Sequence, residues 1–278
     1  MNILEFTLLV GGGSLVAGFL GSLTGLGGGV VLVPLLTLLF GVDIRYAIGA
    51  SLVSVIATSS GSAAAYVKEG FSNIRIGMFL EIATTLGALL GAFLAVKVPT
   101  SAIAIVFGAV LLYSAYLSAK PQHETEEDHH PDPLATRLRM NGTYPAIDGT
   151  KAYFVHNVPT GFSLMLGAGA LSGLLGIGSG ALKVLAMDHA MRIPFKVSTT
   201  TSNFMIGVTA AASAGVYLNR GYVDPGLAMP VMLGVLAGSL VGARVLARTR
   251  TRWLRIVFSA VILVLGIEMV YNGIAGRI

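Results

Sequence analysis

The sequence predicts an all-α protein that crosses a membrane several times, and three observations support that fold class. Of the 278 residues, 54% are hydrophobic and 11% are charged, with a mean hydropathy of +0.80, whereas soluble domains have roughly 25% charged residues. The apolar runs reach about 20 residues, the length of a helix across a bilayer. They are also apolar on every face, whereas barrel strands alternate in segments of about ten residues.

Composition also excludes several functional classes. Cysteine is absent, so neither a disulfide scaffold nor a thiolate metal site is available. The formal net charge of +5 comes from lysines and arginines scattered between apolar runs, where such residues anchor helix ends. A nucleic-acid partner is therefore not expected, and the lipid bilayer is.

The apolar runs predict about eight transmembrane helices in two sets of four. These runs are Ile3–Phe40, Ala47–Val67, Ile76–Val96 and Ser101–Leu117, then Pro159–Met191, Val197–Leu218, Gly226–Ala247 and Trp253–Tyr271. The predicted organisation is a first membrane repeat at 1–117, a hydrophilic linker at 118–158 and a second membrane repeat at 159–278. Asn-Gly and Asp-Gly dipeptides within alternating residues of the linker predict a small β-hairpin.

An internal repeat relates the two sets. Sliding the chain by 151 residues aligns them without a gap, with Gly25 on Gly176 and Ser51 on Ser202. Two glycine pairs with small-xxx-small spacing also coincide and predict close helix packing; they are Gly87 with Gly91 and Gly238 with Gly242.

The number of crossings sets the relation between the halves. Four crossings per half is an even number, so both halves should share one orientation, as in parallel-repeat transporters. An inverted repeat needs an odd number, and a glycine break that turns its helix back would change the parity. The positive-inside rule, applied to the short loops, places both termini and the linker outside.

Glycine-rich segments interrupt the first run of each set. The run 3–40 is about twice the length of one crossing, and each glycine costs about 1 kcal/mol in a helix interior. A half-helix should therefore follow each break. Broken helices persist in a bilayer only where protein buries them or where they line a wet cavity, and a half-helix N-terminus attracts anions. The alternative is that the glycines only permit close packing.

The resulting hypothesis is a small-anion site between the two breaks. Lys183 follows the second break within an apolar run, and an intramembrane lysine is a functional candidate by default, the alternative being that it snorkels to an interface. The polar residues at the start of the following span are expected either to line the same cavity or to hydrogen-bond to carbonyls of their own helix. The predicted substrate-binding residues are Gly25, Gly27, Gly28, Gly29, Ser51, Gly176, Gly178, Ser179, Gly180, Lys183, Thr201, Ser202 and Asn203.

Other ionisable residues are expected to play lesser parts. Glu81 and Glu268 fall near predicted span ends, so hydrated interface positions are expected, with a proton relay as the alternative. The run from His123 to His130 is expected to be a solvated linker rather than a metal site. The spans show no paired carboxylates and no Ser/His pair, so no catalytic residue, metal or cofactor is predicted.

Six segments carry a resemblance to a known family. They are GFLGSLTGLGGG at 18–29, VPL at 33–35, AIGASL at 47–52, SGLLGIGSG at 172–180, TTS at 200–202 and GYVD at 221–224. Together they resemble the TauE/SafE sulfite exporter family of bacterial and archaeal membrane proteins. The resemblance implies passage of sulfite, sulfonates or related organosulfur acids across the cytoplasmic membrane. Ser179, Lys183 and Leu185 depart from the pattern, which makes the two halves chemically unequal.

The sequence therefore favours a multi-pass transporter of small sulfur-containing anions, with Lys183 as the counter-charge, and not an enzyme. A passive small-anion channel on the same scaffold is the alternative. The expected partners are a small anionic substrate and the bilayer, and a homo-oligomer is compatible with the sequence.

Overall fold

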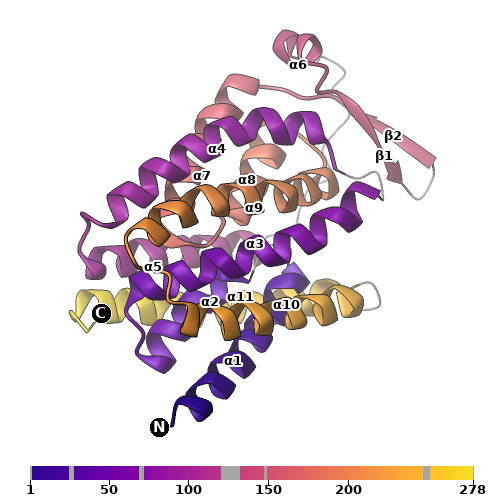
Figure 1. Cartoon of the computed structure of the whole chain (residues 1–278). Coiled ribbons are helices and arrows are strands. Elements are labelled where there is room, and N and C mark those ends of the chain that lie inside the picture. Colours follow the sequence, from indigo (N-terminus) through magenta and orange to yellow (C-terminus); the bar gives the residue numbers. More distant parts are fainter. Residues whose placement is uncertain are drawn as a thin grey trace.

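The computed structural model confirms an all-α membrane architecture. It describes residues 2–24, 28–68, 72–119, 132–146, 149–246 and 251–277. Long helices lie side by side, and a short hairpin projects from one end of the bundle (Figure 1). Large apolar side chains such as Leu86 and Leu90 are about half exposed on the outer surface, as expected of a surface in contact with lipid.

The elements follow the two halves and the linker. The first half contains α1 (Ile3–Thr24), α2 (Gly29–Pro34), the π-helical η1 (Leu35–Leu39), α3 (Ile44–Lys68), α4 (Ile74–Ala95) and α5 (Thr100–Ala119). The linker forms α6 (Pro133–Arg137), β1 (Gly142–Ala146) and β2 (Gly149–Tyr153). The second half contains α7 (Val158–Leu175), α8 (Gly180–Leu185), the π-helical η2 (Ala186–Ala190), α9 (Phe195–Asn219), α10 (Pro225–Leu246) and α11 (Thr251–Ile274).

Helix lengths fit the membrane assignment. Among the described residues, α1, α4, α7 and α10 each contain a stretch long and apolar enough to cross a membrane. Shorter apolar stretches lie in α3, α5 and α11 and along α2 and η1. Each of the eight apolar runs contains one long helix, and the first run of each half is split by its glycine-rich segment.

The element bounds recur along the chain. Helices α8, η2, α9 and α10 begin and end 151 residues after α2, η1, α3 and α4. The packing partners correspond too, because α1 packs along α10 as α7 packs along α4, while α3 contacts α9 and α5 contacts α11.

Contacts between loops and helix ends define the two ends of the bundle. At the hairpin end, Asn73 precedes α4 and donates from Nδ2 to the Tyr153 hydroxyl of β2 at 2.7 Å. At the opposite end, Arg45 at the start of α3 donates to the carbonyl of Val98, between α4 and α5, at 3.1 Å. Its guanidinium also lies over the ring of Tyr222, between α9 and α10. Helices α3, α4 and α5 therefore alternate in direction between the ends, as α9, α10 and α11 do.

In each half, the short helices that follow the first long helix lead the chain back to the end at which that helix starts. The amide of His156, before α7, donates to the carbonyl of Met191, after η2, at 3.1 Å, so α7 and η2 meet at the hairpin end. In the first half, the rings of Phe6 in α1 and Phe40 after η1 lie 6.0 Å apart. With re-entrant segments, three helices per half run from end to end. The expected parallel orientation is therefore wrong, and the halves have the opposed orientation of an inverted repeat.

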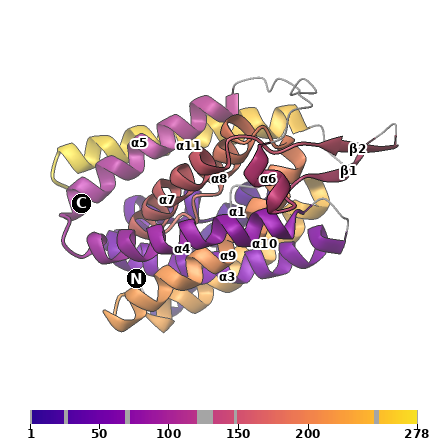
Figure 2. The same cartoon turned by 90° about the horizontal axis from the view of Figure 1, so that it is seen from above.

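Both termini lie at the end opposite the hairpin (Figure 2). Helix α1 runs parallel to α10, since Gly11 approaches Pro230 near the starts of both helices. Helix α11 runs antiparallel to α5, since the hydroxyl of Ser259 donates to the carbonyl of Ala115 at 2.9 Å. The expectation that the linker lies on the same side as both termini is wrong, because α3, α4 and α5 carry the chain to the other end.

Glycines set the closest helix contacts, as the sequence predicted for Gly87 and Gly91. A Cβ at either position would overlap the backbone of α7, at Leu166 and Ala170 respectively. In the other half, a Cβ at Gly238 would overlap the backbone of Leu15 in α1. Packing of helix backbones on each other replaces the hydrophobic drive that lipid cannot supply.

The linker hairpin lies over the start of α4. Strands β1 and β2 are antiparallel, with Gly142 opposite Tyr153. Asn73 caps α4, since its Oδ1 accepts from the amide of Ile76, and it joins the helix to the hairpin through Tyr153. The run His123–His130 lies outside the described residues.

Candidate functional site

The two glycine breaks meet inside the bundle. The hydroxyl of Ser51 on α3 donates to the carbonyl of Gly176, at the end of α7, at 2.7 Å. A Cβ at Gly29, the first residue of α2, would lie 2.7 Å from the Ser51 hydroxyl and 3.0 Å from the Gly176 carbonyl oxygen. The absence of a side chain at Gly29 thus permits the contact between the halves. All three residues are buried.

Left-handed backbone shapes the second break. Gly176, Gly178 and Ser179 have φ angles of +67°, +70° and +48°. Glycine adopts such angles readily, whereas a serine held there stores strain of about 1–3 kcal/mol. Such strain gathers at functional sites. The sequence did not reveal this strain at Ser179, because serine in a glycine-rich segment carries no conformational signal.

Two serine hydroxyls beside this break have no hydrogen bond within the described part of the chain. They belong to Ser172 on α7 and to Ser179, and both residues are at most 1% exposed. Buried hydroxyls without partners are rare in native proteins. The two oxygens are groups that a bound polar molecule would satisfy.

Helix α9 connects the break to a buried charge. The hydroxyl of Ser202 donates to the carbonyl of Gly180, the first residue of α8, at 3.3 Å. Thr209 follows Ser202 by seven residues, or about two helical turns, so both lie on nearly the same face of α9. Lys183 on α8 reaches Thr209 because helical side chains lean toward the N-terminus of their helix. The ammonium group therefore points back toward the break.

Lys183, Thr209 and Glu81 form a buried cluster, named here the Lys–Thr–Glu cluster. The Lys183 ammonium donates to the Thr209 hydroxyl at 2.5 Å, and that hydroxyl donates to Glu81 Oε1 at 2.6 Å. The distance from Lys183 Nζ to Glu81 Oε2 is 3.9 Å. Lys183 is 0% exposed and Glu81 is 8% exposed. Snorkelling of Lys183 to an interface is therefore excluded.

Glu81 is the main site residue that the sequence prediction missed. The expected hydrated interface position is wrong, because Glu81 lies two turns into α4 on the face that packs against α7 and α9. Its Oε1 also accepts from Thr85 at 3.2 Å, while its Oε2 has no hydrogen bond among the described residues. The one available signal was that Glu81 is the only acid in the run 76–96.

The remaining predicted residues divide into four groups. Gly178 is buried beside Ile206 and Val55, with its left-handed φ at the break. Asn203 takes part through its backbone carbonyl, which accepts from the Ser59 hydroxyl at 2.6 Å. Two others face away from the meeting point: Gly28 packs against Val235 of α10, and the Thr201 hydroxyl accepts from the Asn73 amide. Gly25 and Gly27 lie outside the described residues.

The arrangement suits binding of an anion more than bond-breaking chemistry. It offers one buried ammonium and two unpartnered hydroxyls near a strained break. The carboxylate of Glu81 balances the ammonium, so the cluster carries no net charge when both groups are ionised. An anion at this place would compete with Glu81 for Lys183.

The comparisons with known proteins agree with this geometry. The family described as "Sulfite exporter TauE/SafE" matches residues 10–269, and the chain belongs to that family. Two relatives are each 29% identical: "Probable membrane transporter protein YunE" of Bacillus subtilis (strain 168), and "Probable membrane transporter protein MJ0441" of Methanocaldococcus jannaschii. The first alignment covers 98% of this chain and 99% of the relative, the second 96% and 95%. A "Probable membrane transporter protein" of Xylella fastidiosa (strain 9a5c) is 26% identical over the whole of both chains.

No solved structure matches the chain. The family and the names of its members identify this protein as a membrane transporter. The apolar helices of the chain make it a multi-pass membrane protein.

Proposed function

We propose that this protein carries small sulfur-containing anions, such as sulfite or sulfonates, across the cytoplasmic membrane. The observation that supports this most is the fully buried ammonium of Lys183, which follows Ser179 of the second glycine break by four residues. The family description supplies the substrate class. The substrate oxygens would accept from Lys183 and from the hydroxyls of Ser172 and Ser179.

The energetics of a buried lysine favour a functional role. An ammonium at the centre of a membrane helix costs at least about 2.5 kcal/mol on insertion scales. Replacing a buried ion pair with apolar residues is often neutral or stabilising. The fold therefore has no need of the Lys183–Glu81 pair for stability, and binding of an anion is a function that justifies its presence.

The opposed halves favour a carrier over a passive channel. In transporters with inverted repeats, the substrate site lies between discontinuous helices near the bilayer midplane, and one half rocks against the other around it. Ser51 of one half bonded to Gly176 of the other is the kind of contact that such rocking would break. A carrier should saturate with substrate, whereas a channel should show unitary currents.

The test is anion exchange in liposomes that contain the purified protein. Labelled sulfite inside is exchanged against sulfite, thiosulfate, sulfoacetate, taurine or sulfate outside, with acetate and phosphate as controls. We expect saturable exchange with at least one sulfur oxyanion. The variant Lys183→Leu combined with Glu81→Met should abolish it without leaving an unpaired buried charge.

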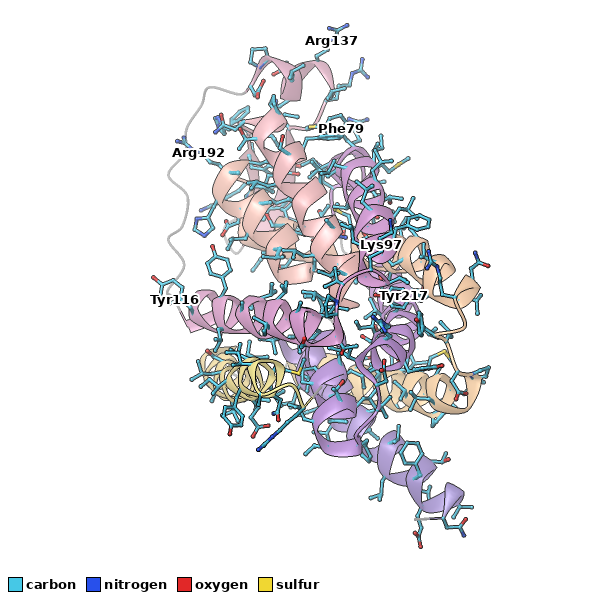
Figure 3. All side chains as sticks on the ribbon, turned by 90° about the vertical axis from the view of Figure 1, so that its left-hand side faces the viewer. Phe79, Lys97, Tyr116, Arg137, Arg192 and Tyr217 are labelled. Carbon is cyan, nitrogen blue, oxygen red and sulfur yellow. The ribbon has the colours of Figure 1, made fainter. Side chains whose placement is uncertain are left out.

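The matched control is Lys97→Met, which removes an exposed lysine between α4 and α5 (Figure 3) and should leave exchange unchanged. Exchange with acetate and phosphate but with no sulfur anion would overturn the substrate class. Full exchange by the double variant would remove Lys183 from the site.

A further inference from the structure

We propose that Glu81 carries a proton together with the transported anion, so that the anion binds at Lys183 only when Glu81 is protonated. This inference rests on the proposed function and adds its energy source. It assigns a role to a buried acid that the transport of an anion does not by itself require.

The first argument is the charge balance of the Lys–Thr–Glu cluster. Lys183 and Glu81 are both buried and lie 3.9 Å apart, so the ionised cluster is neutral. An anion that enters would leave one negative charge uncompensated in a medium that solvates charge poorly. A proton on Glu81 removes that excess, because the carboxyl becomes neutral and the ammonium is released to the anion. One proton then accompanies each negative charge that Lys183 accepts.

The second argument is that one carboxyl oxygen is placed to take the proton. Oε1 of Glu81 accepts from Thr209 at 2.6 Å and from Thr85 at 3.2 Å. Oε2 is buried and has no hydrogen bond among the described residues. A proton can therefore add to Oε2 without breaking a hydrogen bond. Thr209 has a single hydroxyl proton, and it has a second acceptor, the carbonyl of Met205 at 3.0 Å, once Glu81 is neutral.

The third argument is that no other described charge competes for this role. Helix α4 packs against α7 and α9. Helix α7 contains no ionisable side chain, and α9 contains Lys196, which is exposed, and Tyr217, whose hydroxyl donates to the Gly173 carbonyl. On α8 and η2, Asp188 lies 3.9 Å from His189. Within the described residues, Lys183 is the charged group that faces Glu81.

The fourth argument comes from the positions that the repeat makes equivalent to those of the cluster. The offset of 151 residues relates Lys183 to Leu32, Glu81 to Met232 and Thr209 to Thr58. Leu32 is fully buried in α2, as Lys183 is in α8. The same fold therefore closes the equivalent place with leucine and methionine. A charged pair at only one of the two equivalent places is not a packing requirement of the architecture.

The experiment separates proton coupling from transport itself. The whole protein is reconstituted in liposomes. Valinomycin, with equal potassium on both sides, holds the membrane potential at zero, and a gradient of one pH unit is imposed. The probes are labelled sulfite and labelled methanesulfonate, with protein-free liposomes as the baseline. Methanesulfonate is included because it stays ionised across the pH range. With one proton per anion, the wild type should accumulate the anion up to about tenfold in the more alkaline compartment.

The variant Glu81→Gln fixes the neutral state of residue 81. Wild-type exchange should weaken as the pH rises, because Glu81 loses its proton. Exchange by the variant should not weaken, and the pH gradient should drive no accumulation of the anion. The matched control is Glu268→Gln, which removes an exposed acid on α11 and should accumulate the anion as the wild type does. The variant Glu81→Met with Lys183→Leu should fold and neither exchange nor accumulate the anion.

Each outcome decides the proposal. Wild-type exchange without accumulation under the pH gradient would overturn proton coupling and leave the proposed function in place. Accumulation by Glu81→Gln equal to that of the wild type would assign the proton to another group. Failure of the wild type to exchange any sulfur anion would overturn the proposed function, and this inference with it.

Discussion

The Lys–Thr–Glu cluster makes a quantitative prediction about stability. Lys183→Leu alone leaves the Glu81 carboxylate buried without its counter-charge, and Glu81→Met alone leaves the ammonium in the same position. Opposite charges 3.9 Å apart attract by about 4 kcal/mol at an effective dielectric constant of about 20. The free energy of unfolding of each single variant should therefore be about 3–5 kcal/mol lower than that of the wild type.

The double variant should recover that loss. Leucine and methionine occupy the equivalent positions, 32 in the first half and 232 in the second, so the architecture accepts both side chains. The free energy of unfolding of the double variant should lie between the wild-type value and about 4 kcal/mol above it. The coupling between positions 81 and 183 then exceeds the range of about 0.5–3 kcal/mol found for most contacting pairs.

The assay is reversible unfolding in mixed micelles, followed by circular dichroism as the denaturing detergent increases. All four proteins of the double-mutant cycle are measured under one set of conditions. If the loss of unfolding free energy in the double variant equals the sum of the losses in the two single variants, the two groups are not coupled. That result would refute the buried pair and with it the charge-balance argument.

Three further predictions follow from individual contacts. Gly91→Ala should destabilise the protein by about 1–3 kcal/mol, because its Cβ would overlap the Ala170 backbone, whereas Gly12→Ala, with no atom within 4 Å of the new Cβ, should not; thermal unfolding compares the two. Ser51→Ala should slow anion exchange and cost about 1 kcal/mol of stability, because it removes the bond to Gly176, whereas Ser60→Ala loses only a bond to its own helix at Ile56. Since the chain has no native cysteine, Thr143→Cys on the hairpin and Asn2→Cys near the N-terminus can be labelled selectively, and an impermeant maleimide should reach them from opposite sides of the membrane; labelling of both from one side would contradict the inverted arrangement.

The sequence predicted the elements that depend on local chemistry. The glycine-rich segments follow the ends of α1 and α7 because each glycine costs about 1 kcal/mol in a helix and because Gly176 and Gly178 adopt left-handed φ angles. The small-xxx-small pairs pack closely because they lack side chains. Lys183 was identified as a buried cation because no polar neighbour surrounds it in the sequence. These features require no knowledge of distant contacts.

The features that the prediction missed depend on contacts between distant segments. Helix α1 is 22 residues long and has the length of a complete crossing, so its sequence does not indicate that the chain returns beside Phe6. The direction of α2 is fixed by packing against α1 and α3. An error of one crossing per half changes the parity, and the parity alone decides between parallel and inverted halves. Glu81 was misplaced for a similar reason, since its partners are 102 and 128 residues away in the chain.

The inverted arrangement gives the inequality of the halves a mechanical meaning. If the halves were chemically identical, a site between them would present the same surface to both sides of the membrane, and neither side would be distinguished by its charge. Here the ammonium and the carboxyl both belong to the environment of α8, while α2 has Leu32 at the equivalent place. An anion entering from one side therefore meets the charged break, and one entering from the other meets the apolar break. Exchanging the residues at 32 and 183, together with those at 81 and 232, should move the charged pair from α8 and α4 to α2 and α10, and reverse the side from which an entering anion meets the charged break.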